Sequence, residues 1–405
     1  MDTGDRANHP AGMQPLDDLL VVDLTRALAG PFCTVMLSDL GARVIKIETP
    51  DGGDDTRRWG PPFVGTESAY FLGVNRNKES LTLNLKDARA TALLRRLLAR
   101  ADVLVENFRP GIMERFGVGY GAVHAQFPRL IYASISGFGQ DGPYRDRTAY
   151  DLILQGMGGV MGITGGEGGE PVKVGVAVAD ICAGMYAAYG VLAALRVRER
   201  TGEGQLVDAA LLDGQVSWLT YAAGYFFATG QNPGRLGSAH PTIVPYQAFR
   251  TADGFVNVAV GSEAIWRRFA EIVDPTLLDD PRFATNPDRV AHRQDLIARL
   301  EPRFEGRTTR EWTATLEGAG VPTGPILTIA EVFSHPQVHH RQMLQEVDHP
   351  TAGRVRQTGV PVKFSATPGR IRSAPPTLGQ HTDAILRELG VSGVEVATLR
   401  ADGVI

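Results

Sequence analysis

Short apolar runs alternate with amphipathic segments along the first half of the chain. The runs "LLVVDL", "RVIKIE", "DVLVENF" and "PRLIYASISGFG" have the length and composition of buried strands. Ahead of the third run, residues 86–101 repeat apolar side chains at helical spacing, and arginines occupy the opposite face. Strands that alternate with helices in this way indicate βαβ units, and therefore a mainly parallel sheet with helices on both faces.

The pattern changes near residue 230. The stretch "ATGQNPGRLGS" is rich in glycine and proline, which is typical of a linker. Short strands and amphipathic helices such as "AIWRRFAEIV" follow it. We therefore expect a flexible tail at 1–17, a large α/β domain that begins with 18–225, a smaller α+β domain at 230–335, and a last β-like and helical segment at 345–405.

A lone carboxylate, Asp180, directly precedes the longest uncharged apolar run, Ile181 to Leu195. The run is shorter than the roughly 20 residues that span a bilayer, so we expect a buried helix and no membrane partner. On this stretch alone, capping of the first helical turn is the favoured role for Asp180, because Asp accepts backbone N–H groups there. The alternative is chemistry, since a carboxylate with few waters around it is a better nucleophile toward an acyl group.

Composition narrows the class of protein. A chain of 405 residues can bury a large core and form about two or three domains. A net charge of -4 gives no reason to expect a nucleic-acid partner. Two cysteines cannot build a disulfide framework, and neither CxxC nor HExxH is present to hold a metal. The first residues lack the apolar core of a signal peptide, so we expect a cytoplasmic protein.

Familiar motifs for nucleotide binding and hydrolysis are missing. The turn "TRALAGP" after the first strand lacks G-x-G-x-x-G, which argues against a dinucleotide there. The glycine-dense "QGMGGVMGITGGEGGE" has no P-loop lysine, so a flexible loop is the favoured interpretation. No G-x-S-x-G elbow occurs, which leaves no basis for a serine hydrolase.

Several ordered motifs together resemble the class III CoA-transferase family, also called the CaiB/BaiF type. In chain order they are "AGPFCTVMLSDLGARVIKIETPDGGDDTRRWGP", "NRNKESLTLNLK", "VENFRPGIMERFGV", "SISGFGQDGPY" and "AYDLILQGMGG". The resemblance runs over nearly the whole chain, as far as "LGQHTDAILRELG". Within the family, "GSAHPTIVPYQAF" and "GVPTGPI" are similar to the succinyl-CoA:glutarate group.

The resemblance implies that Asp180 is the nucleophile. In these transferases the aspartate attacks the acyl-CoA thioester to give a mixed anhydride and free CoA thiolate. The thiolate then forms an aspartyl-CoA thioester, and the incoming acid repeats the sequence in reverse. Coenzyme A is thus part of a substrate and no permanently bound cofactor is expected, while an acyl-CoA and a small carboxylic acid are the partners. Capping stays compatible with this role, because a helix N-terminus would also steady the carboxylate.

Two other functions stay open. Racemases of the same family remove a proton beside the thioester with a His–Asp pair, and Tyr150 stands where that His is expected. A phenol with a pKa near 10 is a poor base at neutral pH, which argues against a racemase or epimerase. Asp151 keeps the family's acidic position, although a turn or cap role fits it equally well. A non-catalytic CoA-binding protein is the second alternative, and the intact Asp180 disfavours it.

The resemblance also implies where coenzyme A is contacted. Its 3′-phosphate and pyrophosphate favour Arg, Lys and backbone N–H donors. For any one arginine, a solvated surface position is an equal alternative. The expected contacts are Ala29, Arg57, Arg58, Asn75, Lys78, Asn107, Phe108, Arg115, Ser136 and Phe138.

Arg26, Tyr150 and His240 are the candidates for contacts with the substrate acid. A buried carboxylate without a partner is costly, so the distal carboxylate of a dicarboxylate needs a cation such as Arg26 or His240. For His240, a loop histidine satisfied by the backbone is an equal alternative. We expect CoA transfer from succinyl-CoA to a dicarboxylate such as glutarate. The resemblance further implies an interlocked homodimer, in which 345–405 returns to a Rossmann-like large domain.

Overall fold

The computed structural model describes residues 12–405, which form two compact units. Unit 1 contains the residues up to 160, 174–220 and 336–405, and unit 2 contains 161–173 and 221–335. The expected tail at 1–17 lies mostly outside the described residues. Its last residues are packed, because Gln14 and Leu16 are buried and the Leu16 N–H donates to the Leu40 carbonyl oxygen at 3.0 Å.

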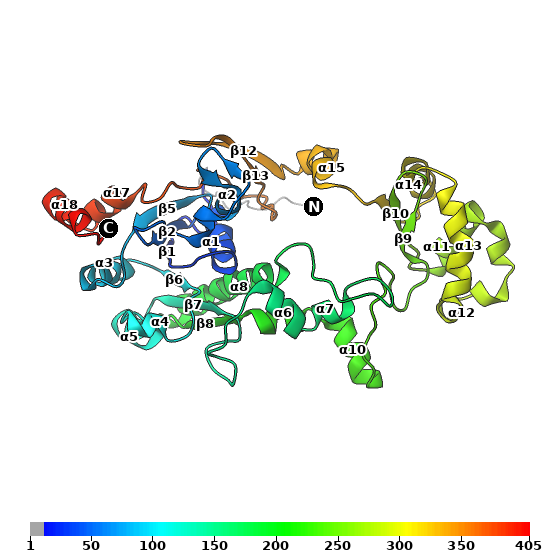
Figure 1. Cartoon of the computed structure of the whole chain (residues 1–405), viewed down its shortest axis with the longest axis horizontal. Coiled ribbons are helices and arrows are strands. Elements are labelled where there is room, and N and C mark those ends of the chain that lie inside the picture. Colours follow the sequence, from blue (N-terminus) through cyan, green and yellow to red (C-terminus); the bar gives the residue numbers. More distant parts are fainter. Residues whose placement is uncertain (1–11) are drawn as a thin grey trace, which may run out of the picture. The chain divides into compact units, whose positions relative to one another are not determined.

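Six parallel strands form the central sheet of unit 1 (Figure 1), in the order β5-β2-β1-β6-β7-β8. This is the doubly wound order, in which the sheet grows in opposite directions from β1 and β6, and it confirms the predicted Rossmann-like α/β class. Ligands of such sheets bind at the carboxyl ends of the strands where the order reverses. The strands are β1 (Leu20–Asp23), β2 (Arg43–Glu48), β5 (Lys78–Thr82), β6 (Val103–Glu106), β7 (Ile131–Ser136) and β8 (Leu206–Ala210).

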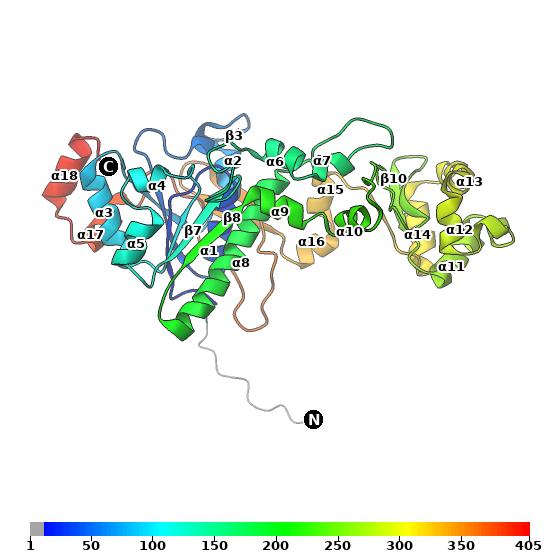
Figure 2. The same cartoon turned by 90° about the horizontal axis from the view of Figure 1, so that it is seen from below.

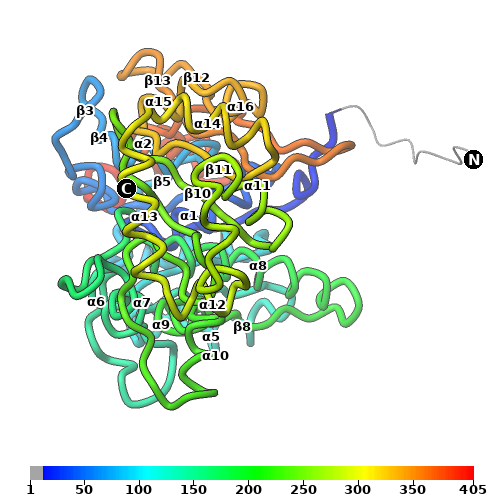
Figure 3. The backbone as a smooth tube through the Cα atoms, turned by 90° about the vertical axis from the view of Figure 1, so that its right-hand side faces the viewer, coloured from blue at the N-terminus to red at the C-terminus, as the bar shows by residue number. Residues whose placement is uncertain are grey.

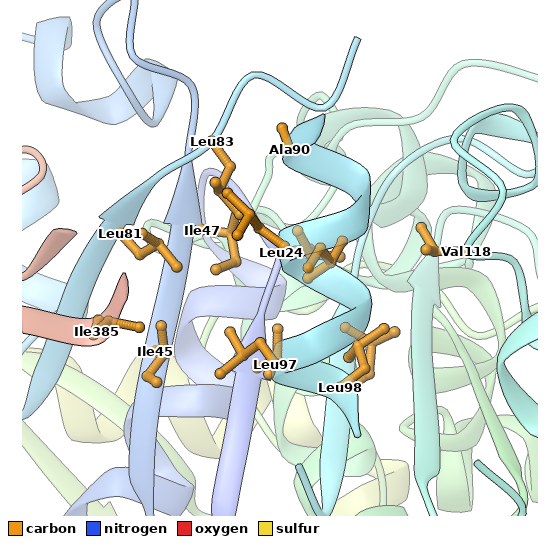
Figure 4. Packing of buried hydrophobic residues seen from close by; sticks show 14 of the residues in the cluster. Leu24, Ile45, Ile47, Leu81, Leu83, Ala90, Leu97, Leu98, Val118 and Ile385 are labelled. Atoms are coloured by element: carbon orange, nitrogen blue, oxygen red, sulfur yellow. The ribbon is translucent and has the colours of Figure 1, made fainter. Parts of the chain in front are cut away.

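Alternate side chains of these strands supply one core on each face of the sheet, as the two-residue period of a strand requires. Val22 and Leu104 join the core under α3 (Ala88–Leu98), where Ala90, Leu97 and Leu98 pack against strand residues (Figure 4). That core also contains side chains of α4 (Ile112–Arg115), α5 (Tyr120–Gln126), α17 (Thr382–Glu388) and α18 (Gly393–Ala401). On the other face, Val21 packs with α1 (Ala29–Asp39) and α8 (Val178–Thr201).

The C-terminal segment closes the β5 edge of the sheet. Ser80 of β5 donates its N–H to His381 Nδ1 at 3.1 Å and accepts the His381 N–H at 3.0 Å on its carbonyl oxygen. The Thr82 N–H donates to Thr382 Oγ1 at 3.1 Å. After this segment, α17 and α18 lie beside α3 (Figure 2). The last part of the chain therefore completes the large unit.

The hairpin of β12 and β13 lies next to α2, the short helix that precedes β5 (Figure 3). Gln357 Nε2 in the hairpin donates to the Leu72 carbonyl oxygen at 3.0 Å, and Thr351 Oγ1 donates to Glu67 Oε1 at 2.9 Å. The elements of this region are the 3₁₀ helix η1 (Asp55–Arg58), β3 (Phe63–Val64), β4 (Glu67–Ser68), α2 (Ala69–Val74), α16 (Pro336–His340), β12 (Leu344–His349) and β13 (Gly353–Thr358). Two further helices of unit 1 are α6 (Asp151–Met157) and α9 (Leu211–Ser217).

Unit 2 is a small α+β unit with an antiparallel sheet in the order β11-β10-β9. Its core is aromatic: Phe304 stacks on Phe249 with ring centroids 4.3 Å apart and lies 4.6 Å from the ring of Trp312. The elements are α7 (Val160–Ile163), α10 (Thr220–Thr229), β9 (Tyr246–Arg250), β10 (Phe255–Ala259), α11 (Glu263–Val273), the 3₁₀ helices η2 (Pro275–Leu278) and η3 (Pro281–Phe283), α12 (Asn286–Ala291), α13 (Arg293–Glu305), α14 (Thr309–Gly318), β11 (Thr323–Pro325) and α15 (Ile329–Ser334).

The glycine-dense segment 161–173 belongs to unit 2, whereas the sequence placed all of 18–225 in the large domain. Its backbone is tied to the linker that follows α10. The Gly237 N–H donates to the Gly165 carbonyl oxygen at 2.8 Å, and Arg235 Nε donates to the Gly169 carbonyl oxygen at 3.0 Å. These bonds join segments far apart in sequence, and their partners are backbone groups that carry no residue-specific signal.

The apolar helix α8 has 24 residues, so it is longer than the uncharged run within it. By length and composition alone it could cross a membrane. In unit 1, however, it buries a stripe of small residues against α1 and the sheet. Gly184 makes the approach possible, because a Cβ atom there would lie 2.5 Å from the Ala29 carbonyl oxygen. One face of α8 is therefore buried, as predicted, whereas Met185, Tyr186, Tyr189 and Leu192 on it are exposed.

Candidate active site

The loop after β1 meets the loop after β6 at the point where the strand order reverses. The Arg26 N–H donates to Asn107 Oδ1 at 2.8 Å, and Asn107 Nδ2 donates to the Arg26 carbonyl oxygen at 2.8 Å. The Arg26 guanidinium lies over the Phe108 ring, 5.2 Å from its centroid. Ala29 begins α1 directly after this loop. Four of the residues singled out from the sequence thus come together at the expected edge of the sheet.

Asp180 occupies the first turn of α8, one turn ahead of the close contact between Gly184 and Ala29. The first residue of α1 therefore lies against the second turn of α8. The N-cap residue of α8 is Ala177, so Asp180 is not the capping residue of this helix. Burial, and then the negative charge of Asp151, raise the pKa of Asp180 to about 7. A half-neutral carboxyl at physiological pH is an unusual state, which favours a chemical role over a capping role.

Asp151, on α6, accepts a backbone N–H group of the first turn of α8, which is the role that sequence alone favoured for Asp180. Its Oδ1 accepts the Ala179 N–H at 2.9 Å, and its Oδ2 accepts from Gln155 Nε2 at 2.8 Å. Gln155 is fully buried, and its Oε1 accepts the Val174 N–H at 2.8 Å. Two side chains of α6 thus fix both the segment that leads into α8 and the first turn of α8 itself.

Removing the charge of Asp151 should move the pH dependence of the transfer reaction that the family resemblance implies. As the nucleophile expected from that resemblance, Asp180 would react as the carboxylate, so the rate should rise with pH through about 7. In Asp151→Asn a neighbouring negative charge is lost, which favours the carboxylate and should lower the acid limb of the kcat profile by about one pH unit. The profile is measured from about pH 5 to 9, a range that brackets this titration.

Two comparisons isolate this charge effect. Gln155→Leu breaks the link to Val174 and keeps the Asp151 charge, so its acid limb should stay near that of the parent. Asp348→Asn removes an exposed carboxylate on β12 and serves as the matched control. An unshifted limb in Asp151→Asn would show that Asp151 does not tune Asp180.

Tyr70, on α2, is a site residue that the sequence analysis did not find. Burial, and then the charges of Asp180, Asp151 and Asp54, raise its pKa to about 12. It therefore stays protonated at neutral pH and can donate a hydrogen bond near the Asp180 carboxyl. Its ring packs edge-on against Trp59 at 5.1 Å. Nothing in "SAYF" distinguishes this tyrosine from a packing residue.

Three of the expected coenzyme A contacts have side chains that are occupied within the protein. Lys78 is 2% exposed, and its Nζ donates to Asn75 Oδ1 at 3.0 Å and pairs with Asp23 at 3.2 Å. Arg57 pairs with Glu48 at 2.7 Å. Buried carboxylates thus already pair with the charges of Lys78 and Arg57, and the contacts of these residues with coenzyme A stay a prediction.

The other expected contacts lie at the surface or along β7. Arg58 and Arg115 are exposed, so both are accessible to phosphates. Ser136 is buried and its Oγ accepts the Gly139 N–H at 3.0 Å, which shapes the turn after β7. Phe138 packs edge-on against Tyr144 at 5.6 Å. Beside them is a cavity of about 250 Å³ whose lining includes Glu106, Arg109, Ser134, Gln140 and Arg145.

The candidates for contacts with the acid are divided between the units. Tyr150 precedes α6 in unit 1 and is 69% exposed. His240 belongs to unit 2, where its ring lies between Tyr221 and Tyr246 at 5.6 and 5.3 Å. The Thr242 N–H donates to His240 Nδ1 at 3.2 Å, so the proton of the neutral ring is on Nε2. His240 therefore presents a hydrogen-bond donor.

The model of a known protein family, CoA-transferase family III, matches residues 16–382. The chain belongs to CoA-transferase family III. This confirms the family and the transferase class that the ordered motifs indicated.

Relatives and solved structures of CoA-transferase family III agree over most of the chain. The human succinyl-CoA:glutarate CoA-transferase is 44% identical over 96% of this chain and 89% of its own. The acetyl-CoA:oxalate CoA-transferase of Acetobacter aceti is 44% identical over 87% of this chain and 89% of its own. A crystal structure of a CaiB/BaiF family protein from Brucella suis is 43% identical, with a TM-score of 0.84 over 93% of this chain and 99% of that one.

Proposed function

We propose that this CoA-transferase moves CoA from succinyl-CoA to a dicarboxylate such as glutarate, with Asp180 as the nucleophile. The main support is the Asp180 carboxyl, which is sheltered from solvent and has a pKa of about 7. It lies in the first turn of α8, and the next turn of α8 packs against the start of α1, where no side chain caps the helix. The names of the human and Acetobacter relatives support dicarboxylates of different lengths as acceptors.

The proposed relay conserves the energy of the thioester. The Asp180 carboxylate attacks the succinyl carbonyl carbon, and the C–S bond breaks to release CoA thiolate. The thiolate attacks the aspartyl carbonyl carbon of the anhydride and expels succinate, which carries one oxygen from Asp180. The acceptor carboxylate then attacks the aspartyl-CoA thioester, and the returning thiolate takes the new acyl group and restores Asp180. Exclusion of water protects both intermediates from hydrolysis.

Several side chains can supply recognition in this proposal. The exposed Arg58 and Arg115 suit the phosphates of coenzyme A, because guanidinium groups bind phosphate oxygens in pairs. Arg26 would meet the distal carboxylate as a cation, and His240 stays the alternative candidate for this contact, as a donor through Nε2. Tyr70 would donate to an oxygen of the anhydride, since it stays protonated at neutral pH.

We also propose that the enzyme is an interlocked homodimer. Exposed apolar side chains lie along α8 and α6 of unit 1, and contiguous patches of this kind mark protein interfaces. They include Met185, Tyr186, Tyr189, Leu192, Leu152, Ile153 and Met157. Sedimentation should give twice the mass of 43.6 kDa.

Labelled oxygen tests the proposed relay. The enzyme is incubated with succinyl-CoA and with glutarate that carries ¹⁸O in its carboxylates. The ¹⁸O content of the released succinate is then measured by mass spectrometry. Each turnover passes one acceptor oxygen to Asp180 and one Asp180 oxygen to the next succinate. At steady state every succinate should therefore hold one ¹⁸O atom.

A panel of acceptors then fixes the substrate class. Linear dicarboxylates of two to six carbons are compared by the acyl-CoA formed, and the five-carbon acid should give the highest kcat/KM. Uptake of deuterium beside the thioester without any acid would indicate a racemase. Coenzyme A binding with neither reaction would indicate a non-catalytic protein, and either result would overturn the proposal.

A further inference from the structure

The loop between β1 and α1 is held by side chains from three other parts of unit 1. Thr25 donates its N–H to Asp23 Oδ1 at 2.8 Å, and its carbonyl oxygen accepts from Lys46 Nζ at 2.7 Å. Asn107 binds both backbone groups of Arg26. The Ala27 N–H donates to Asp54 Oδ1 at 3.2 Å. Consecutive peptide groups are thus bound by partners from β2, the start of η1 and the β6 loop.

Ala27 has a left-handed backbone conformation, with φ of 61°. Residues with a Cβ atom adopt this conformation at a cost, and only glycine adopts it freely. The bond from Ala27 to Asp54 therefore selects a conformation that an unrestrained loop would leave. Residue 28 follows at once as the N-terminal flank of α1, which has no side-chain cap, so the first N–H groups of that helix are unsatisfied donors.

Lys46 and Asp54, two of the side chains that bind this loop, form a fully buried ion pair. Lys46 Nζ lies 2.8 Å from Asp54 Oδ2, and both side chains are inaccessible to solvent. Burial alone would raise the pKa of Asp54, but the charge and hydrogen bond of Lys46 and the hydrogen bonds from Thr56 together hold that pKa below its usual value. A buried pair of this kind adds little stability compared with apolar residues, so its retention needs another reason.

We propose that Lys46 and Asp54 are positioning residues, which fix the left-handed turn at Ala27 and thereby set the start of α1 for acyl-CoA. This inference rests on the proposed function and on the contact between coenzyme A and Ala29 that the family resemblance implies. Lys46 and Asp54 act through the backbone of residues 25–27 and touch no substrate. The pair thus sets the affinity for the CoA moiety through the backbone of this loop.

Variants of Lys46 and Asp54 can separate the effect of an unpaired buried charge on stability from the effect of the loop's position on CoA binding. Lys46→Met and Asp54→Asn each leave one buried charge unpaired, so both single variants should unfold at lower temperature. The double variant removes both charges and should recover most of that loss. Its new amide at position 54 can still accept from Ala27, but no donor remains for the Thr25 carbonyl oxygen. We expect the double variant to bind CoA about tenfold more weakly.

Ala27→Gly in the double-variant background gives a direct check of the turn. Glycine adopts a positive φ without enforcement, so CoA affinity should recover to within about threefold of the parent. Glu79→Gln, which breaks the partly exposed pair with Arg43, is the control and should leave CoA affinity as it was. Binding of CoA is measured by calorimetry, independently of turnover.

The outcomes are distinguishable. A stable double variant that binds CoA as tightly as the parent would overturn the positioning role, and so would an Ala27→Gly substitution that recovers nothing. A parent enzyme that neither binds CoA nor transfers it would overturn the proposed function instead.

Discussion

Asp180→Asn should abolish CoA transfer and, above pH 7, make the protein more stable. Loss of a nucleophile costs about 10⁴-fold or more in kcat when no other group can replace it. An amide cannot form the anhydride with a thioester under these conditions. The transfer is followed by the acyl-CoA products, and mass spectrometry of the variant excludes reversion of the introduced amide to a carboxylate by deamidation.

The gain in stability follows from the raised pKa. The pKa of Asp180 is about 7 in the folded protein against an ordinary 3.8, so the unfolded chain releases this proton at lower pH. Stability is therefore lost as pH rises from about 4 through 7. The Asp180→Asn variant avoids this loss, and we expect about 2 kcal/mol at pH 8, because solvent screening reduces the roughly 4 kcal/mol of the full shift.

Thermal unfolding at two pH values checks the sign. The variant and the parent should unfold at similar temperatures at about pH 4, and the variant at a higher temperature at about pH 8. Asp141→Asn, in an exposed loop, is the control and should change neither activity nor stability. Equal stability of the Asp180→Asn variant and the parent at the higher pH would show that ionisation of Asp180 does not destabilise the folded protein.

Gly184→Ala should destabilise unit 1 and slow catalysis together. The added Cβ would lie 2.5 Å from the Ala29 carbonyl oxygen and 3.3 Å from the Cys33 nitrogen, and both are backbone atoms of α1. Helix α8 must then shift, at a cost of about 2–3 kcal/mol, which is the usual range for an overpacked core. Since Asp180 lies one turn away, a displacement of this kind should lower kcat at least about tenfold.

Gly73→Ala is the matched control for this prediction. Gly73 also lies in a helix, α2, and a Cβ atom there meets no other atom within 4 Å. It should leave stability equal or slightly higher, because alanine is the better helix former. Urea unfolding gives the stability of both variants, and the rates are compared where each is fully folded. A Gly184→Ala variant as stable as the Gly73→Ala variant would contradict the close packing.

Local pattern was enough to predict the alternating strands and helices of unit 1. The spacing of Ala90, Leu97 and Leu98 placed α3 correctly, because one face of that helix is buried against the sheet. The order of the strands, the two units and the membership of 161–173 depend on contacts between distant segments. Periodicity carries no information about such contacts.

The site was only partly predictable, for a related reason. Motif order identified Asp180, whereas helix propensity alone favoured a cap that the structure gives to Asp151. Lys78 is a cation by composition, but its buried partner Asp23 makes it part of the scaffold. Tyr70 and Gln155 have no sequence signal, because their roles arise from the charges and peptide groups that the fold brings near them.

The return of the C-terminal segment to β5 has a consequence for synthesis on the ribosome. Until residue 382 has emerged, Ser80 and Thr82 lack the partners that close their edge of the sheet. Unit 2, whose residues end at 335, is complete earlier. Until residue 382 has emerged, β5 of the nascent large unit has an unpaired strand edge, and such an edge is a template for aggregation. Premature termination near the end of the message should therefore yield an insoluble product, even though Asp180 and the other candidate site residues had already been made.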